Sequence, residues 1–265
     1  MKTSISEEAH YWDTVAEVWL RRRSQALWRI HSDAVNSSLL RCWLPVGRVE
    51  HLLKTDLFDE AFSGGMYPQL SLRAQNVIGI DISALTLQAA RSRQGDRLMV
   101  RADVRHSPFA SSSFDAIIST STLDHFKSPH EIVASLRELR RVLRVGGQLL
   151  LTMDNLMNPV IALRNALPFR LLNRLGLVPY YIGATYGPRR LRRVLQQVGF
   201  EVVEVHAVMH CPRLLAVNLA QVLEGRTGPA VQRGLLRCLM AFEGLSRWPT
   251  RFLTGHFIAV RALKR

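Results

Sequence analysis

The sequence predicts an α/β fold, a doubly wound and mostly parallel sheet of seven strands with helices on both faces. Short apolar runs alternate with stretches of helical period, and such alternation gives a parallel sheet that is covered on both sides. Hydrophobic residues make up 48% of the 265 residues, which is enough to fill one large core. The seven expected strands are Val49–Leu53, Val77–Ile80, Leu98–Val100, Asp115–Ser119, Gln148–Thr152, Glu201–Val208 and His256–Leu263.

Helical stretches precede the first strand and separate later ones. Residues 7–43 carry an apolar stripe at helical spacing, marked by Trp12 and Trp19, and a Pro-Val-Gly sequence ends the stretch. We expect this region, residues 1–47, to form a helical cap. Further helices are expected at 83–93 and 129–142, and a pair of glycines follows the second of them, as is typical after a helix.

Two helical inserts interrupt the alternation in the second half of the chain. The first, residues 155–187, is rich in leucine and arginine, and the second spans residues 213–250. A basic helix at 188–198 is expected between the first insert and the sixth strand. The sequence shows no internal repeat and no long linker, so we expect residues 1–265 to form a single domain.

The composition excludes several classes of protein. No run reaches the roughly 18 uninterrupted apolar residues that a membrane span requires, and the first residues lack the pattern of a secretory signal. The three cysteines lack the spacing of a zinc site, so we expect no metal and a reducing, cytoplasmic environment. The formal net charge of +14 suits nucleic acid or an anionic membrane surface as a partner, but the arginines are spread along the chain.

The residues that carry chemistry follow the expected strands, since ligands bind at the carboxyl ends of parallel strands. Asp81 ends the second run and is followed by Ile82, and its carboxylate can accept hydrogen bonds from both hydroxyls of a ribose. Asp103, followed by Val104, ends the third run, where it suits the exocyclic amine of an adenine. Two acids at neighbouring strand ends therefore indicate a nucleoside ligand.

Several motifs occur in a fixed order around these acids. They are Gly79-Ile80-Asp81-Ile82-Ser83, Pro108-Phe109 with Phe114-Asp115, Leu123-Asp124-His125, Leu139 to Gly147, Leu195 to Glu204, and Gly255 to Val260. Together they make the chain resemble a class I S-adenosylmethionine-dependent methyltransferase, most clearly from Val49 to Thr152. The resemblance implies the Rossmann-like fold of that family and S-adenosylmethionine as cofactor. It also implies that Asp81 and Ile82 lie at the ribose, and Asp103 and Val104 at the adenine.

The first strand departs from the pattern of this family. There the strand runs into an acid and a glycine-rich loop, whereas Lys54, Thr55 and Asp56 stand here and no such loop follows. Two interpretations are open. Either these side chains, together with Ser119, contact the methionine end of the cofactor in place of loop backbone, or this half of the pocket has decayed. The absent glycines also argue against a nicotinamide dinucleotide, whose pyrophosphate needs them.

Methyl transfer needs few protein groups, because the sulfonium already activates the methyl carbon and the protein mainly aligns the reactants. His125 follows the fourth strand, where the resemblance implies that it faces the sulfonium, so it is the candidate general base. The alternative is that it orders its loop or contacts the cofactor. Tyr180, Tyr181 and His210 are candidates for the acceptor pocket, against a purely structural role.

These observations predict an enzyme that moves the methyl group of S-adenosylmethionine to a small-molecule or lipid-like acceptor. The leucines of the first insert are open to three interpretations: a lid over an apolar acceptor, peripheral contact with a membrane surface, or packing onto the sheet. Two alternatives to the predicted function stay open. One is an RNA or DNA methyltransferase, which the charge favours, and the other is a non-catalytic scaffold that has lost the cofactor.

Overall fold

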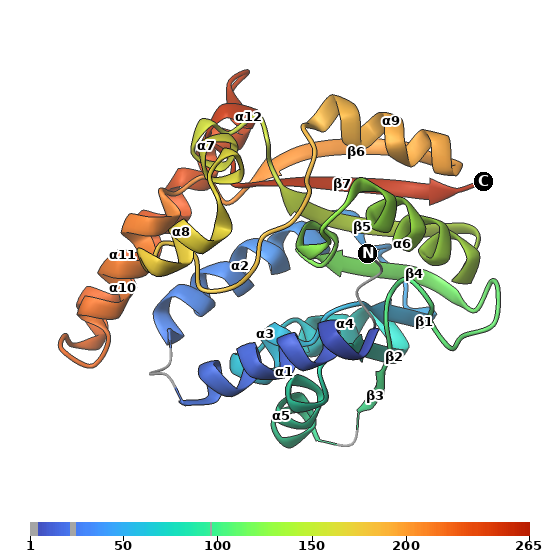
Figure 1. The fold of residues 1–265 in the computed structure, drawn as a ribbon, viewed down its shortest axis with the longest axis horizontal. Coiled ribbons are helices and arrows are strands. Elements are labelled where there is room, and N and C mark those ends of the chain that lie inside the picture. Colours follow the sequence, from blue (N-terminus) through green and yellow to red (C-terminus); the bar gives the residue numbers. More distant parts are fainter. Residues whose placement is uncertain (1–4, 22–24, 96) are drawn as a thin grey trace.

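Seven strands form one sheet in the order β3-β2-β1-β4-β5-β7-β6, which confirms the predicted fold class (Figure 1). The structure, a computed structural model, describes residues 5–21, 25–95 and 97–265. Strands β1 to β5 are parallel, and β7 pairs antiparallel with both β5 and β6. The strands are β1 (Val49–Lys54), β2 (Ala74–Asp81), β3 (Leu98–Arg101), β4 (Phe114–Thr120), β5 (Leu143–Asp154), β6 (Phe200–Val208) and β7 (Phe257–Lys264).

Helices cover both faces of this sheet. None of the helices in the described part of the chain has the length and apolarity needed to cross a bilayer. They are α1 (Ile5–Arg21), α2 (Ala26–Trp43), α3 (Phe58–Phe62), α4 (Tyr67–Arg73), α5 (Ala84–Gln94), η1 (Leu123–His125), α6 (Pro129–Val142), α7 (Pro159–Ala166), α8 (Phe169–Arg174), α9 (Pro188–Val198), α10 (Arg213–Leu223), α11 (Pro229–Ala241), η2 (Phe242–Arg247) and α12 (Arg251–Thr254).

The central strands are buried on both sides, as their continuous apolar sequences require. Leu53 and Ile117 point into a core that α6 and α9 cover, whereas Leu52 and Ile118 point into a second core formed with α2, α4 and α5. This alternation follows from the two-residue period of a strand. A third, smaller core lies between α2, α10 and α11, so the N-terminal region and the second insert pack together.

Two parts of the structure differ from the sequence prediction. The expected helix at 7–43 is two helices, α1 and α2, and residues 22–24 lie outside the described residues. The segment after β1, where no element was expected, forms α3 and α4. These helices pack so closely on β2 that a Cβ at Gly79 would lie 2.4 Å from the Tyr67 hydroxyl. Glycine at this position therefore allows the close approach of the helices to β2.

A buried ion pair fixes the end of β1. Lys54 and Glu60 are both fully buried, with 2.7 Å between Nζ and Oε2. Glu60 Oε1 also accepts a hydrogen bond from the backbone N–H of Met66 at 2.8 Å, so the pair joins β1 to α3 and α4. Burial alone would lower the pKa of Lys54, but nearby carboxylates, above all Glu60, outweigh burial and hold this pKa above its usual value.

Removal of one partner should strongly destabilise the fold. We expect Glu60→Gln to lower the free energy of unfolding by about 3–5 kcal/mol, because Lys54 is left buried without a counter-charge. Glutamine keeps the acceptor for Met66, so the variant isolates the charge. Urea unfolding followed by circular dichroism measures the effect.

The double variant Lys54→Met with Glu60→Gln is the matched control. It should recover much of the loss, since no uncompensated charge is left in the interior. Equal stability of the wild type and Glu60→Gln would contradict this account of the first loop.

Candidate functional site

A large cavity lies at the carboxyl ends of the central strands. It has a volume of about 1360 Å³, and its lining comes from α1 and α2, from the ends of β1, β2, β4 and β5, and from both inserts. Pockets for one small ligand usually measure roughly 300–1,000 Å³. The cavity therefore has room for a nucleoside cofactor and a second molecule together.

Asp81 lines this cavity at the end of β2. Its Oδ1 accepts a hydrogen bond from the Ser83 backbone N–H at 2.8 Å, and its Oδ2 accepts one from Leu57 at 3.1 Å. Each carboxylate oxygen can accept a second hydrogen bond. Burial, and next the neighbouring Asp56 carboxylate, raise the pKa of Asp81 to about 7. Asp81 is therefore held in place by backbone while acceptor capacity stays available, and Ile82 lines the cavity beside it.

Two of the four residues expected at the methionine end of a cofactor line the cavity, namely Thr55 and Asp56. Burial raises the pKa of Asp56, whose Oδ1 accepts a hydrogen bond from the Phe58 backbone N–H at 2.9 Å. Ser119 lies fully buried behind Thr55, which donates to it at 2.9 Å. Lys54 points away, because its ammonium is paired with Glu60. Neither Lys54 nor Ser119 is placed to contact a ligand in this cavity, contrary to expectation.

Asp103 and Val104 both line the cavity, but the Asp103 carboxylate is already occupied. Both of its oxygens accept from Arg105, with 2.6 Å between Nη2 and Oδ2. Arg105 also pairs with Glu131 at 2.8 Å and with Glu8 of α1. Asp103 therefore helps to hold α1 over the cavity, and an adenine amine would have to share this carboxylate with a guanidinium.

Helix α1 covers the cofactor side of the cavity through further polar contacts. Asp13 accepts from the Ser83 hydroxyl at 2.6 Å and from the Leu85 backbone N–H at 3.1 Å. The hydroxyl of Tyr11 accepts from the backbone N–H of Tyr181 at 2.6 Å. These contacts place α1 and the first insert at the same opening.

His125 lines the cavity on the η1 turn that follows β4. Its Nδ1 lies 3.0 Å from the Tyr181 carbonyl oxygen, which can only accept, so Nδ1 carries the hydrogen and Nε2 is the basic nitrogen. The ring has edge contacts with Trp12 at 5.0 Å and with Tyr180 at 5.4 Å between centroids. The ring is thus oriented by its neighbours, and Nε2 can accept a proton.

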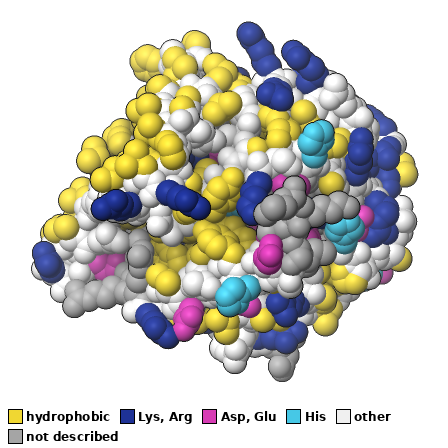
Figure 2. Space-filling view, in the orientation of Figure 1, with side chains coloured by type: hydrophobic (Ala, Val, Ile, Leu, Met, Phe, Trp, Pro, Cys, Tyr) yellow, Lys and Arg dark blue, Asp and Glu magenta, His cyan; other side chains and the backbone are white. Residues whose placement is uncertain are grey.

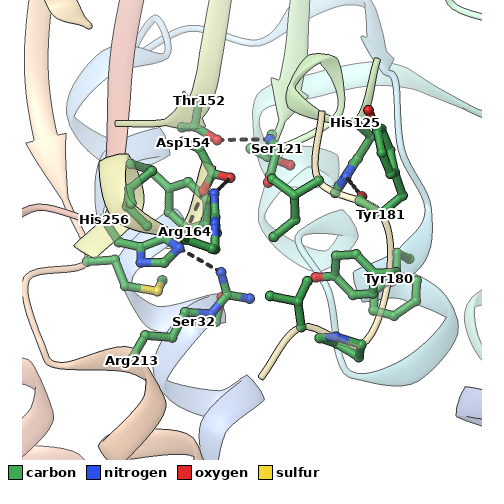
Figure 3. Close-up of a pocket in the computed structure, with 18 of the residues that line it drawn as sticks. Ser32, Ser121, His125, Thr152, Asp154, Arg164, Tyr180, Tyr181, Arg213 and His256 are labelled. Atoms are coloured by element: carbon green, nitrogen blue, oxygen red, sulfur yellow. Dashed lines mark hydrogen bonds and ion pairs between the residues drawn. The ribbon is translucent and has the colours of Figure 1, made fainter. Parts of the chain in front are cut away.

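The sequence prediction did not include the polar cluster on the opposite wall of the cavity (Figure 3). Asp154, at the end of β5, pairs with Arg164 of α7 and lies 3.4 Å from Nε2 of His256. Arg213 of α10 donates to the same nitrogen at 2.9 Å. Figure 3 shows these residues facing His125 and Tyr180 across the cavity. Because Asp154 directly follows an apolar strand, the rule that selected Asp81 could have selected it too.

Neighbouring groups fix the charge states in this cluster. Burial disfavours ionisation of Asp154, but its contacts with His256 and Arg164 outweigh burial and hold its pKa well below the usual range. Burial also lowers the pKa of His256, to about 4, despite the contact with Asp154. Asp154 is therefore a carboxylate at neutral pH, and His256 is uncharged.

Apolar side chains surround the outer part of the cavity. Figure 2 shows hydrophobic side chains over the helices of the inserts and in the hollow at the centre of this face, with arginines and lysines dispersed around them. Several cavity-lining leucines of α7 and α10 are exposed, among them Leu163 (63%) and Leu215 (72%).

His210 is buried, and its Nδ1 lies 2.7 Å from the Thr254 hydroxyl, with which it is hydrogen-bonded. No cluster of three or more metal-ligating side chains occurs among the described residues.

Comparison with known proteins agrees with this geometry. Residues 61–151 match the family model described as a methyltransferase domain. Over 76 residues the chain is 38% identical to the probable tRNA methyltransferase 9B of Bos taurus, a match that covers 29% of this chain and 16% of that protein. Over 79 residues it is 37% identical to the malonyl-acyl-carrier-protein O-methyltransferase of Legionella pneumophila, covering 29% of this chain and 27% of that protein. The chain thus matches a minor part of each of these relatives.

A solved structure shows the same fold over most of the chain. The geranyl diphosphate C-methyltransferase of Streptomyces coelicolor, solved with geranyl diphosphate and S-adenosyl-L-homocysteine, has a TM-score of 0.57 at 13% identity, over 88% of this chain and 77% of that one. The family resemblance seen in the sequence is confirmed by the matched domain and the fold. Residues 61–151 of this chain thus form a methyltransferase domain, on the fold that class I S-adenosylmethionine-dependent methyltransferases share.

Proposed function

We propose that this protein transfers the methyl group of S-adenosylmethionine to a small-molecule or lipid-like acceptor. One observation carries the proposal: the Asp81 carboxylate lies at a strand end of the matched domain, with acceptor capacity available, in a cavity large enough for two ligands. A carboxylate so placed suits the two hydroxyls of a ribose. The apolar outer half of the cavity, formed by the inserts, suits an apolar acceptor.

The residues around Asp81 fit most of the cofactor. Ile82 and Val104 supply apolar contacts for an adenine, and Asp56, one strand away, supplies a negative charge for the ammonium of the methionine tail. Thr55 adds a hydroxyl at the same place. When bound, S-adenosylmethionine supplies a methyl group on a sulfonium, which is already activated for in-line displacement.

The protein's own part in the reaction is to orient the acceptor, exclude water and accept a proton where the acceptor must lose one. Helix α1 and the inserts exclude water by covering the cavity. Nε2 of His125 is the proton acceptor in this proposal, and the Tyr181 carbonyl holds the tautomer that makes this nitrogen basic. The acceptor would lie between His125 and the apolar residues of α7 and α10.

An RNA acceptor is the second candidate, because one relative is named a tRNA methyltransferase and the net charge is +14. Binding of tRNA that weakens steeply as salt rises would favour it. The arginines are spread along the sequence and not concentrated in one segment, which favours the small-molecule proposal instead.

The Asp81 carboxylate should dominate the affinity for the cofactor product. We expect Asp81→Asn to weaken binding of S-adenosylhomocysteine by about tenfold or more, because an amide nitrogen cannot accept a ribose hydroxyl. Isothermal titration calorimetry measures the change.

Asp115→Asn is the matched control for this variant. Asp115 lies near the start of β4, at the opposite end of the sheet, where it accepts from the backbone N–H of His51 at 2.8 Å. This control should keep the wild-type affinity even if it loses stability. Failure of the wild type itself to bind S-adenosylhomocysteine would support the non-catalytic scaffold.

Binding should also depend on pH through Asp81. Its pKa of about 7 means that the carboxyl is protonated in acid and ionised in mild base, and only the ionised form accepts two hydroxyls. We therefore expect the affinity for S-adenosylhomocysteine to rise as the pH increases through 7.

The free protein should show the opposite trend in stability. Because the pKa of Asp81 is higher in the folded than in the unfolded state, stability from this group is lost as the pH rises from about 4 to about 7. Titrations at several pH values, and urea unfolding at the same values, test both trends. An affinity independent of pH in the wild type, or an equal pH dependence in Asp81→Asn, would contradict the role of Asp81.

A further inference from the structure

Arg213 differs from the other arginines that line the cavity. Arg29 lies 3.5 Å from the Asp59 carboxylate, and Arg164 pairs with Asp154. Arg213 instead donates to the uncharged ring of His256 at 2.9 Å. Within the part of the chain that the structure describes, no carboxylate oxygen lies within 4.0 Å of its guanidinium nitrogens.

The wall that contains Arg213 therefore carries an excess of positive charge. Arg164 and Arg213 contribute two cations, whereas Asp154 contributes one anion that already binds Arg164. His256 is uncharged and so does not offset this positive charge, and its Nε2 accepts the hydrogen bond from Arg213. The bond to His256 uses one of the five N–H groups of Arg213, and the side chain lines the cavity.

The surroundings of the Arg213 guanidinium are apolar. Its Cζ lies 5.8 Å from the ring centre of Trp28 and 5.6 Å from that of Phe257. The adjoining mouth of the cavity is lined by Val160 and Leu163 of α7 and by Leu214 and Leu215 of α10. Arg213 is partly buried, and a guanidinium in such a position binds an anion more strongly than one on an open surface, because water screens the attraction less.

We propose that Arg213 binds the anionic group, a phosphate or a carboxylate, of an amphiphilic acceptor whose apolar chain occupies the mouth between α7 and α10. The planar fork of arginine suits both anions, because it can donate two parallel hydrogen bonds. The identification of this ligand as the methyl acceptor rests on the proposed function. The proposal that Arg213 binds such an anion does not depend on the proposed function.

Octyl phosphate is the probe for this site, with octan-1-ol and inorganic phosphate as the two separate halves. Calorimetry measures binding, and tryptophan fluorescence, to which Trp28 beside Arg213 is one of five contributors, follows it independently. We expect the wild type to bind octyl phosphate about tenfold more tightly than either half, because charge-assisted hydrogen bonds and apolar burial add.

Three variants assign the effect to Arg213. Arg213→Gln should lose the preference for octyl phosphate over octan-1-ol, and Arg213→Lys should keep part of it, since the charge is retained. Arg237→Gln, on an exposed position of α11, is the matched control and should behave as the wild type. A preference that persists in Arg213→Gln would overturn the proposal, and so would binding of inorganic phosphate as tight as that of octyl phosphate.

Titration of the same samples with S-adenosylhomocysteine separates this proposal from the proposed function. If the protein binds octyl phosphate through Arg213 but does not bind S-adenosylhomocysteine, this result contradicts the proposed methyl transfer and supports the anion site. If the protein binds S-adenosylhomocysteine but binds octyl phosphate no more tightly than octan-1-ol, this result overturns the anion site alone. Unchanged nucleoside binding by Arg213→Gln also shows that this variant is folded.

Discussion

Two partly buried carboxylates, Asp56 and Asp81, line the cavity at the ends of neighbouring parallel strands, and the surrounding contacts of the site hold them in this unfavourable position. Burial raises the pKa of both carboxyls, and the Asp56 carboxylate raises the pKa of Asp81 further. Backbone N–H groups of Leu57, Phe58 and Ser83 hold the two side chains in place. A ligand with hydroxyl and ammonium donors would relieve this unfavourable arrangement, which is why we regard the pair as the centre of function.

An ion pair joins the end of β1 to α3, where the family has a glycine-rich turn. Lys54 and Glu60 neutralise each other below the cavity and hold α3 against β1. This leaves Thr55 and Asp56, which directly follow β1, as residues that line the cavity. Side chains fixed by this ion pair and by backbone N–H groups thus stand where the family has a glycine-rich turn.

The sequence allowed the sheet to be predicted because apolar strands and their order are local properties, and the carboxyl-end rule located Asp56, Asp81 and His125 in one cavity. It could not show that Lys54 points away, because its partner Glu60 lies on a helix that the sequence did not reveal. The pairing of Asp103 with Arg105 and the cluster of Arg213 with His256 were equally hidden. Arg213 and His256 lie 43 residues apart and are brought together only by the three-dimensional fold, whereas Arg105 is two residues from Asp103 and the sequence does not show which way the two side chains turn.

The most direct measurement of the central claim is a crystal structure of the protein with S-adenosylhomocysteine. The account predicts that both ribose hydroxyls lie within hydrogen-bonding distance, about 2.5–3.0 Å, of the Asp81 carboxylate, with the amino-acid tail toward Asp56. A nucleoside bound elsewhere, or a ribose that leaves Asp81 uncontacted, would contradict it.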